Sequence, residues 1–313
     1  MLLLLALACD PTPKTGVIGQ PDGSTDTQDT ASAPLDPLAL AGEVSQDNLA
    51  TTLDALAGLG TRHTATDGDT LAADWLEAHL QDLGYDVERA AFDADGEPAE
   101  NVIARLEGAD PSVIWVYSAH YDSTSDQPET LAPGADDNAS GVAAVLEAAR
   151  ILRDQPLQHS VWFVLTAAEE QGSLGSAALA AQWSAEGLDI RGVIAPDMIG
   201  YWPAGDDDAF DILGDEDSEA LANDMAAAAD ALGVPYKLWI EHRYCYGDDH
   251  TSYQHMDFPA ISPMDCVEAH NVPSSGEDTP HYHRTTDTPD TVHLPFTARV
   301  AGVIVATLAG WAG

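Results

Sequence analysis

Five side chains that can bind a metal ion each follow a short apolar run or a turn in this chain. They are His120 in SAHYDS, Asp137 in PGADDNASG, Glu170 in TAAEEQG, Asp197 in APDMIG and His283 in HYHRTTDTPD. Zinc takes imidazole nitrogens and carboxylate oxygens as ligands and keeps an open position for water at catalytic sites. Two imidazoles, three carboxylates and the spare Glu169 beside Glu170 suit two zinc ions and a water. The set therefore predicts a dizinc hydrolase.

Three apolar runs must position these side chains. They are VIWVY (113–117), VWFVL (161–165) and GVIA (192–195), and their β-branched and aromatic residues predict strands buried on both faces. Stretches of helical period, such as residues 142–152, alternate with these runs. This alternation predicts an α/β fold in a single globular domain, with a mostly parallel central sheet flanked by helices. Ligands bind beyond the carboxyl ends of the strands in such sheets, and the candidate ligands fall there.

Each motif also has an interpretation without a metal. The HYD sequence at residues 120–122 is typical of a surface turn, and Asn138 suits the N-cap of the helix that follows it. Glu169 and Glu170 suit the first turn of a helix, where the helix dipole favours acidic residues. Asp197 fits such an alternative least well, because a carboxylate directly after a buried strand is costly unless it is paired. The shared position of these motifs at strand ends favours the metal site.

Longer motifs resemble the secreted bacterial dizinc aminopeptidases, which are zinc exopeptidases related to glutamate carboxypeptidases and glutaminyl cyclases. The resemblance covers roughly residues 44–313. Its motifs are LGTRHTATDG, AADWLEAHLQDLGYDV, HYDS, GADDNASGVAAVLE, TAAEEQGSLGS, PDMIG, GDDHTSYQHMDFPAI and YHRTTDTPDTV. One position departs from the family pattern, since Arg284 stands where the family has Thr after the ligand histidine. His281 is therefore an alternative ligand, and the fixed distance to DTPD favours His283.

The resemblance implies a role for each ligand. Asp137 would bridge both metal ions, with His120 and Asp197 on one ion and Glu170 and His283 on the other. The implied cofactor is two Zn²⁺ ions per chain. Cobalt or manganese can substitute in such a mixed site, so the identity of the metal follows from the resemblance and not from the ligand types.

Three further residues would take part in the reaction. Asp122 would accept a hydrogen bond from the ring nitrogen of His120 that is not on the metal and would so fix the ring. Glu169 would take a proton from the metal-bridging water and pass it to the leaving amine. Tyr282 would stabilise the tetrahedral oxyanion, with a packing role as the alternative. Asp136 would be a turn residue or would support the ligands.

The resemblance leaves more than one activity open. We expect an aminopeptidase that releases N-terminal residues from peptides. A related zinc amidohydrolase, such as a carboxypeptidase, an acylamino acid deacylase or a glutaminyl cyclase, is the alternative. A substrate that ends in a carboxylate would require a nearby arginine or lysine, and the scarcity of both favours recognition of an amine. A non-catalytic binding protein is disfavoured, because neither a ligand nor the base is missing.

The composition is strongly acidic. Lys and Arg number 11 against 53 Asp and Glu, which gives a formal net charge of −42. Such a surface repels nucleic acids and anionic membranes and attracts cations, among them a peptide with a free N-terminus. A solubility or salt-tolerance feature is the favoured explanation of the acidic surface, and recruitment of a cationic substrate is the alternative.

The N-terminus predicts export. Residues 1–9, MLLLLALAC, resemble the end of a bacterial signal, and the residues before Cys9 resemble the box that precedes a lipid-modified cysteine. Residues 10–42 are rich in Pro, Thr, Ser, Gly and Asp and predict a flexible linker. Residues 43–313 would form the catalytic domain. We expect a lipoprotein of the cell envelope, with simple secretion as the alternative.

The other two cysteines, Cys245 and Cys266, stand on either side of GDDHTSYQHMDFPAI. An even number of cysteines in an exported protein commonly forms disulfides. We expect a disulfide that closes this loop, and two free buried thiols are the alternative.

Overall fold

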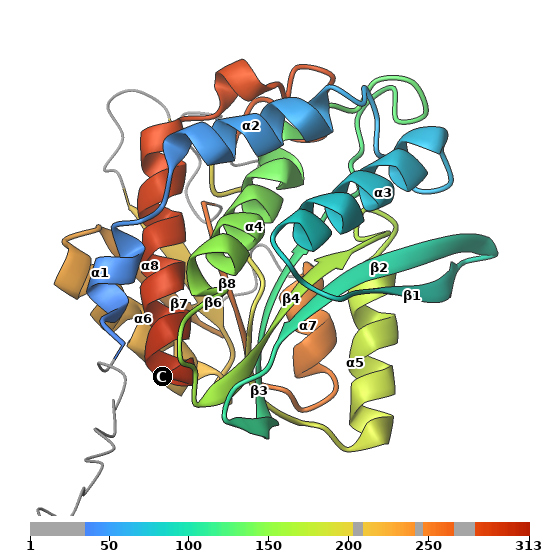
Figure 1. Cartoon of the computed structure of the whole chain (residues 1–313). Helices are drawn as coiled ribbons and strands as arrows, with labels where there is room; N and C mark the ends of the chain where they lie inside the picture. Colours follow the sequence, from blue (N-terminus) through green and yellow to red (C-terminus); the bar gives the residue numbers. More distant parts are fainter. Residues whose placement is uncertain (1–34, 203–208, 242–246, 266–278) are drawn as a thin grey trace, which may run out of the picture. The chain divides into compact units, whose positions relative to one another are not determined.

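An eight-stranded sheet, in the order β1-β2-β4-β3-β5-β8-β6-β7, forms the centre of the computed structural model (Figure 1). The structure describes residues 35–202, 209–241, 247–265 and 279–313. The strands are β1 (Val87–Ala94), β2 (Glu97–Leu106), β3 (Asp110–His120), β4 (His159–Thr166), β5 (Asp189–Ile194), β6 (Phe210–Gly214), β7 (Tyr236–Ile240) and β8 (Ala260–Met264). The helices are α1 (Pro37–Ala41), α2 (Gln46–Ala57), α3 (Asp67–Asp82), α4 (Gly141–Leu152), α5 (Leu174–Glu186), α6 (Glu219–Leu232), α7 (Asp249–Gln254) and α8 (Leu294–Ala312).

The middle of the sheet is parallel. Strands β4, β3, β5 and β8 all run in the same direction, so their carboxyl ends meet at one edge. The β1–β2 hairpin joins β4 through antiparallel pairing, and β6 joins β8 in the same way. The predicted α/β class is confirmed. The whole sheet is mixed, because β2 pairs with β4 and β6 pairs with β8 in antiparallel directions, while β6 and β7 are parallel.

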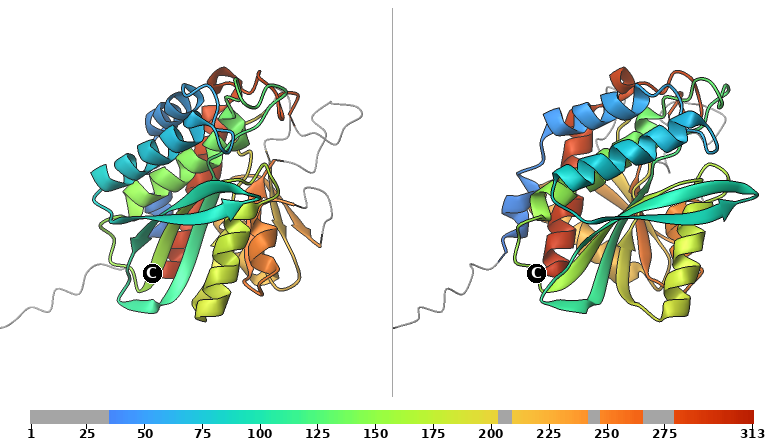
Figure 2. Two further views of the ribbon diagram at one scale, coloured as in Figure 1. Left: turned by 90° about the vertical axis from the view of Figure 1, so that its right-hand side faces the viewer. Right: turned by 45° about the vertical axis from the view of Figure 1, so that its right-hand side comes forward.

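Helices cover both faces of the sheet (Figure 2). Helices α2, α3, α4 and α8 pack on one face with the larger core, and α5 and α7 pack on the other. Neighbouring residues of β4 serve the two cores, since Phe163 packs in the first and Val164 in the second. The predicted apolar runs are therefore strands buried on both faces, as expected for the centre of a parallel sheet.

Helix α8 is a core element of the first of these two layers. Within the described ranges it is the one helix whose length and composition would suffice to cross a membrane, yet 67% of that stretch is buried in the protein. It contacts α1, α4 and α6 as well as β3 and β4. Its apolar character is thus explained by packing.

Side chains at the helix starts agree with the sequence. Ser45 and Thr66 accept hydrogen bonds from the backbone N–H groups of Asn48 and Asp69 and so cap α2 and α3. The N-cap position of α4 is Ser140, whose side chain makes no capping hydrogen bond. Asn138 lies further back, in η1, but its Oδ1 accepts from the N–H of Gly141, the first residue of α4, at 3.0 Å.

The predicted linker boundary is wrong at its C-terminal end. Helix α1 forms within residues 10–42, with Asp36 as its N-cap and with Leu40 and Ala41 buried. Leu40 packs into the main core, a contact that the average composition of the stretch conceals. The ordered domain therefore begins before residue 43. Cys9, the signal-like residues 1–9 and most of the predicted linker lie outside the described residues.

Candidate metal centre

The five predicted ligands lie together at the carboxyl edge of the parallel strands. His120 is the last residue of β3, Glu170 follows β4 and Asp197 follows β5. Asp137 lies on the irregular turn η1 (Ala135–Ser140) that precedes α4, and His283 lies on the segment before α8. Neighbouring parallel strands bring the first three together, and the two loops supply the others.

The ligand atoms form two groups that share Asp137, and the atoms of each group lie within 4.8 Å of one another. In the His120 group, His120 Nε2 lies 3.4 Å from Asp137 Oδ1 and 3.3 Å from Asp197 Oδ1. In the His283 group, His283 Nε2 lies 3.3 Å from Asp137 Oδ2 and 3.1 Å from Glu170 Oε2. The two oxygens of Asp137 thus face different groups.

The two groups differ in their exposure. The His120 side chain is 2% exposed and that of Asp197 is 10% exposed. In the other group the Glu170 side chain is 2% exposed, but that of His283 is 39% exposed. The centre is therefore closed behind His120 and open to solvent beside His283.

The carboxylates of the two ligand groups favour bound cations. Burial alone would lower the pKa of both histidines, but Asp197 and Asp137 raise that of His120 well above its usual value. Asp137 and Glu170 likewise raise the pKa of His283 to about 10. Burial and Asp137 raise the pKa of Glu170 to about 8. Within the described residues Glu170 Oε1 is buried without a hydrogen-bond partner. The donor set and this unpaired oxygen fit zinc ligation.

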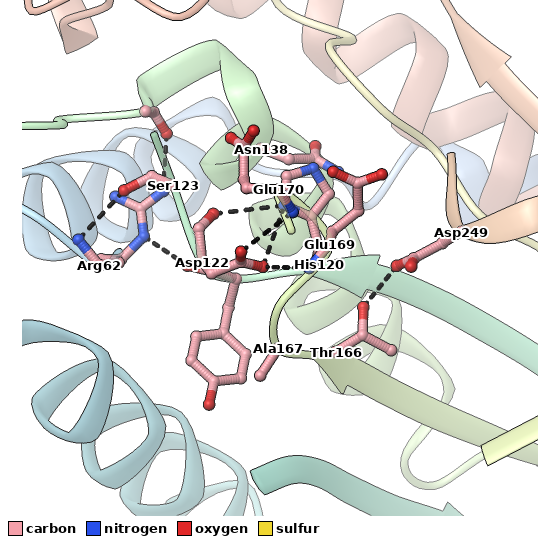
Figure 3. A network of polar contacts seen from close by, with 12 residues as sticks. Arg62, His120, Asp122, Ser123, Asn138, Thr166, Ala167, Glu169, Glu170 and Asp249 are labelled. Carbon is pink, nitrogen blue, oxygen red and sulfur yellow. Dashed lines mark hydrogen bonds and ion pairs between the residues drawn. The ribbon is translucent and has the colours of Figure 1, made fainter. Parts of the chain in front are cut away.

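Asp122 contacts His120 and also supports the centre in a second way. The ring Nδ1 of His120 lies 3.3 Å from the main-chain oxygen of Asp122 and 3.6 Å from its carboxylate. The Asp122 carboxylate also accepts the backbone N–H groups of Glu169 and Glu170, at 3.0 and 3.2 Å (Figure 3). The carbonyl therefore orients the ring and leaves Nε2 facing the centre, while the carboxylate orients the loop after β4.

Glu169 belongs to neither ligand group. Its Oε1 lies 3.0 Å from the hydroxyl of Ser173, and burial raises its pKa well above the usual value. Tyr282 stacks on the imidazole of His283, with ring centroids 3.7 Å apart. Tyr282 thus supports a predicted ligand, a contact that the sequence did not reveal. His281 lies outside both groups, with Nδ1 3.0 Å from Thr286 Oγ1.

Arg62 is a residue of the centre that sequence reasoning missed. Its guanidinium is fully buried and donates hydrogen bonds to the main-chain oxygens of Tyr121, Pro133 and Gly134, at 2.6, 2.6 and 2.8 Å. These bonds hold the end of β3 against the start of η1. The signal was an arginine inside the LGTRHTATDG motif of a chain that has few arginines.

Gly134 allows this close approach. Its φ is +52°, and a Cβ there would lie 2.4 Å from the main-chain oxygen of Asp137. Three other residues near the centre, Ala168, Met198 and His283, also have positive φ. Such conformations are uncommon for residues with a side chain and concentrate at functional sites. The backbone is therefore shaped around the ligands.

The predicted disulfide partners Cys245 and Cys266 lie outside the described residues. Their pairing stays a prediction.

A helix-covered sheet that holds two His and carboxylate groups around a shared aspartate defines a metallohydrolase. The sequence model of peptidase family M28 matches residues 101–308. The chain therefore belongs to peptidase family M28, and its relatives are zinc metalloproteases. This finding confirms the resemblance noted in the sequence.

Several relatives with similar sequences are fungal. A probable zinc metalloprotease of Pyrenophora teres f. teres is 29% identical in an alignment of 332 positions, gaps included, that covers 86% of this chain and 67% of the relative. Leucine aminopeptidase 1 of Arthroderma otae is 29% identical in an alignment of 292 positions, gaps included, that covers 85% of this chain and 74% of the relative. The family resemblance thus extends beyond bacterial proteins.

Solved structures share the fold. The aminopeptidase LapA of Legionella pneumophila superimposes with a TM-score of 0.75 at 23% identity, covering 88% of this chain and 74% of that one. A glutaminyl cyclase of Fimbriiglobus ruber gives a TM-score of 0.70 at 21% identity, covering 85% and 95%. The same fold therefore occurs in proteins with two different activities.

Proposed function

We propose that the protein is a dizinc aminopeptidase that hydrolyses the N-terminal peptide bond of peptides. The observation that carries this proposal is the shared Asp137, whose two oxygens face two separate ligand groups at 3.4 and 3.3 Å from His120 and His283. A carboxylate that bridges two cations needs this arrangement. His120 and Asp197 would hold one ion, and Glu170 and His283 would hold the other.

When bound, the zinc pair supplies Lewis acidity, which acidifies water and polarises a peptide carbonyl. Glu169 lies next to the ligand Glu170 without belonging to either group, so its carboxylate is free to take a proton from the attacking water. The same carboxyl can then give this proton to the leaving amine. The hydroxyl of Ser173, 3.0 Å from Glu169 Oε1, restricts the position of this side chain.

A small, buried apolar cluster lies beside the centre, and from its position we infer a preference for an apolar N-terminal side chain of the substrate. Met198, Leu213 and Met264 form its buried part, and Trp239 and Tyr282 pack against it. Met198 follows the ligand Asp197 and Tyr282 precedes the ligand His283, so the cluster adjoins both groups. The similarity to a protein described as a leucine aminopeptidase agrees with this preference.

Glutaminyl cyclase activity is the second candidate, because cyclases share the fold at TM-scores of 0.70 and 0.71. Two complete ligand groups favour the aminopeptidase, since a single-zinc cyclase would not require both histidines with all three carboxylates. Cyclisation of an N-terminal glutamine releases ammonia, whereas an aminopeptidase releases the amino acid.

One substrate panel tests this proposal. Purified protein is assayed with leucyl, lysyl and glutamyl anilides, with an N-acetylated leucyl anilide, and with a peptide that begins with glutamine. We expect fast cleavage of the leucyl anilide, none of the acetylated one, and loss of activity in chelator that zinc restores. Equal cleavage of free and acetylated substrates would refute amine recognition, and release of ammonia from the glutamine peptide would favour the cyclase.

We also propose that the protein is exported and that Cys9 carries a lipid. The support is the composition of residues 1–9 and of the linker after them. In a bacterial host, the full chain is expected to fractionate with membranes and a Cys9→Ser variant with the soluble envelope fraction. Equal soluble recovery of both forms would contradict the lipid.

A further inference from the structure

Three aspartates near the centre bind backbone amides. They are Asp122, Asp136 and Asp287, here called the amide-binding aspartates, and each uses both carboxylate oxygens for two consecutive N–H groups. Asp122 accepts from Glu169 and Glu170 at 3.0 and 3.2 Å, Asp136 from Gly200 and Tyr201 at 2.7 and 3.1 Å, and Asp287 from Asp136 and Asp137 at 2.9 and 3.0 Å. Each aspartate is buried. Their oxygens are thus committed to amides.

Every one of these contacts joins two segments that carry predicted ligands. Asp122 links the His120 segment to the loop of Glu170. Asp136 links η1, which carries Asp137, to the segment that follows Asp197. Asp287 links the segment of His283 back to η1. The amide-binding aspartates therefore fix the spacing between ligands that lie far apart in the sequence.

Asp136 and Asp287 act on different halves of the centre. The segment held by Asp136 begins with Asp197, a member of the His120 group, and Gly200 lies so close that a Cβ there would be 2.7 Å from Asp136 Oδ1. The segment held by Asp287 carries His283, whose side chain is 39% exposed. The other partner, η1, is buried throughout and is also held by Arg62 through Gly134. The His283 segment is also held by Asp126, which accepts the N–H of Thr285 at 3.1 Å, so loss of the Asp287 carboxylate contact would loosen this segment without freeing it, and would loosen η1 less.

We propose that Asp136 and Asp287 are positioning residues that each set the metal affinity of one group, Asp136 for the His120 group and Asp287 for the His283 group. This inference rests on the proposed two-zinc function. Neither residue belongs to either ligand group. Each would act by holding a ligand segment at the spacing that zinc requires, and changes in such supporting contacts typically weaken metal binding by about 10- to 100-fold.

The test measures the stepwise binding of metal ions to the metal-free full chain. Calorimetry monitors the binding of Zn²⁺, and visible absorption monitors the binding of Co²⁺. The wild type is compared with Asp136→Asn, Asp287→Asn and the exposed control Asp154→Asn, which changes the same charge. A His283→Ala variant identifies the binding step that belongs to the His283 group. Circular dichroism of each metal-free protein reports folding independently.

We expect Asp287→Asn to raise the Kd of the step that His283→Ala abolishes by about 10- to 100-fold, with the other step changed by less than about threefold. Asp136→Asn should show the reverse selectivity, and Asp154→Asn should change neither step. Equal weakening of both steps by both variants, or no weakening, would overturn the inference. A wild type that binds a single ion would instead refute the proposed function.

A second variant for each contact tests the inference if the first variant fails to fold. Gly200→Ala pushes on the Asp136 carboxylate from the partner side without a change of charge, and Asp287→Glu keeps the charge of Asp287 but misplaces it. The same step-selective changes are expected from these two variants. Unselective changes would again contradict the positioning roles.

Discussion

The two ligand groups that share Asp137 each include a carboxylate that follows a strand, Asp197 or Glu170, but their histidines are held by different parts of the fold. His120 ends β3 and Asp197 follows β5, and their side chains are 2% and 10% exposed. His283 lies on a loop and is 39% exposed. Strands in the middle of a sheet cannot move without breaking its ladder, whereas a loop moves once a few side-chain contacts are lost. The His120 group should therefore bind its ion more tightly, and the His283 group should exchange its ion and admit substrate.

Removal of Glu169 should lower the catalytic rate without changing the metal binding of either ligand group. Glu169→Ala is expected to lower kcat by about 10²- to 10⁴-fold, the usual contribution of a general base. Its zinc content should stay equal to that of the wild type, because Glu169 belongs to neither group. Steady-state kinetics and elemental analysis of the same samples measure both quantities.

The matched control is Glu107→Ala, which removes an exposed glutamate. It should leave kcat unchanged. Near-wild-type turnover in Glu169→Ala would show that another group is the base.

Removal of the two histidines should have unequal effects on stability. In metal-free protein His120→Ala leaves buried carboxylates without their partner, which typically costs about 3–5 kcal/mol of unfolding free energy. His283→Ala removes a more exposed partner, although it also leaves Glu170 without that partner, and should cost less than His120→Ala. Urea unfolding of both variants measures the difference. Equal losses would refute the contrast between a closed and an open half.

Helix α7, which packs against the strands next to the His120 group, should make the stability of the protein depend on pH. Burial lowers the pKa of His250, on α7, to about 4, and α7 packs against β3 and β5. Between pH 6.5 and 4 the unfolded chain therefore binds more protons than the folded one, so stability falls as the pH falls through this window. At about 1.4 kcal/mol per pKa unit, the loss amounts to roughly 3 kcal/mol.

A His250→Phe variant tests this dependence. The difference in unfolding free energy between variant and wild type should shift in favour of the variant from pH 6.5 down to 4 and stay constant above pH 7. Parallel pH profiles would show that His250 does not titrate in this window.

Salt should affect the two groups unequally as well, by the smallest amount of the four effects. Exposed charges are screened within about 8–10 Å at ordinary ionic strength, and buried ones are screened much less. Raising NaCl from 0.05 to 0.5 M should therefore weaken zinc binding more at the His283 group than at the His120 group. Calorimetric titration at both salt concentrations measures this. A larger change at the His120 group would contradict the assigned exposures.

The sequence predicts the half of the site that depends on strands better than the half that depends on loops. The apolar runs at 113–117 and 161–165 lie in β3 and β4, and the run at 192–195 ends one residue beyond β5, because a strand buried on both faces needs continuous apolar residues. The positions of His120, Glu170 and Asp197 follow from the strand ends. The β1–β2 hairpin and the antiparallel attachment of β6 carry no comparable signal, because their sequences are short or half exposed.

The contacts that fix the loops were beyond sequence reasoning. Asp122 has its carboxylate on backbone amides and its carbonyl on His120, and Asp287 acts on residues about 150 positions away. Arg62 donates hydrogen bonds to main-chain oxygens, and because every residue carries such an oxygen, a sequence pattern does not point to these partners. In a chain with 53 acidic residues, composition does not single out the few that are buried. Only the folded backbone distinguishes them.

Anomalous diffraction at the zinc edge, from crystals of the active enzyme, tests the two-ion centre most directly. Two peaks are predicted, one between His120 and Asp197 and one between Glu170 and His283, with Asp137 between them. A single peak, or none at these positions in active protein, would contradict the account.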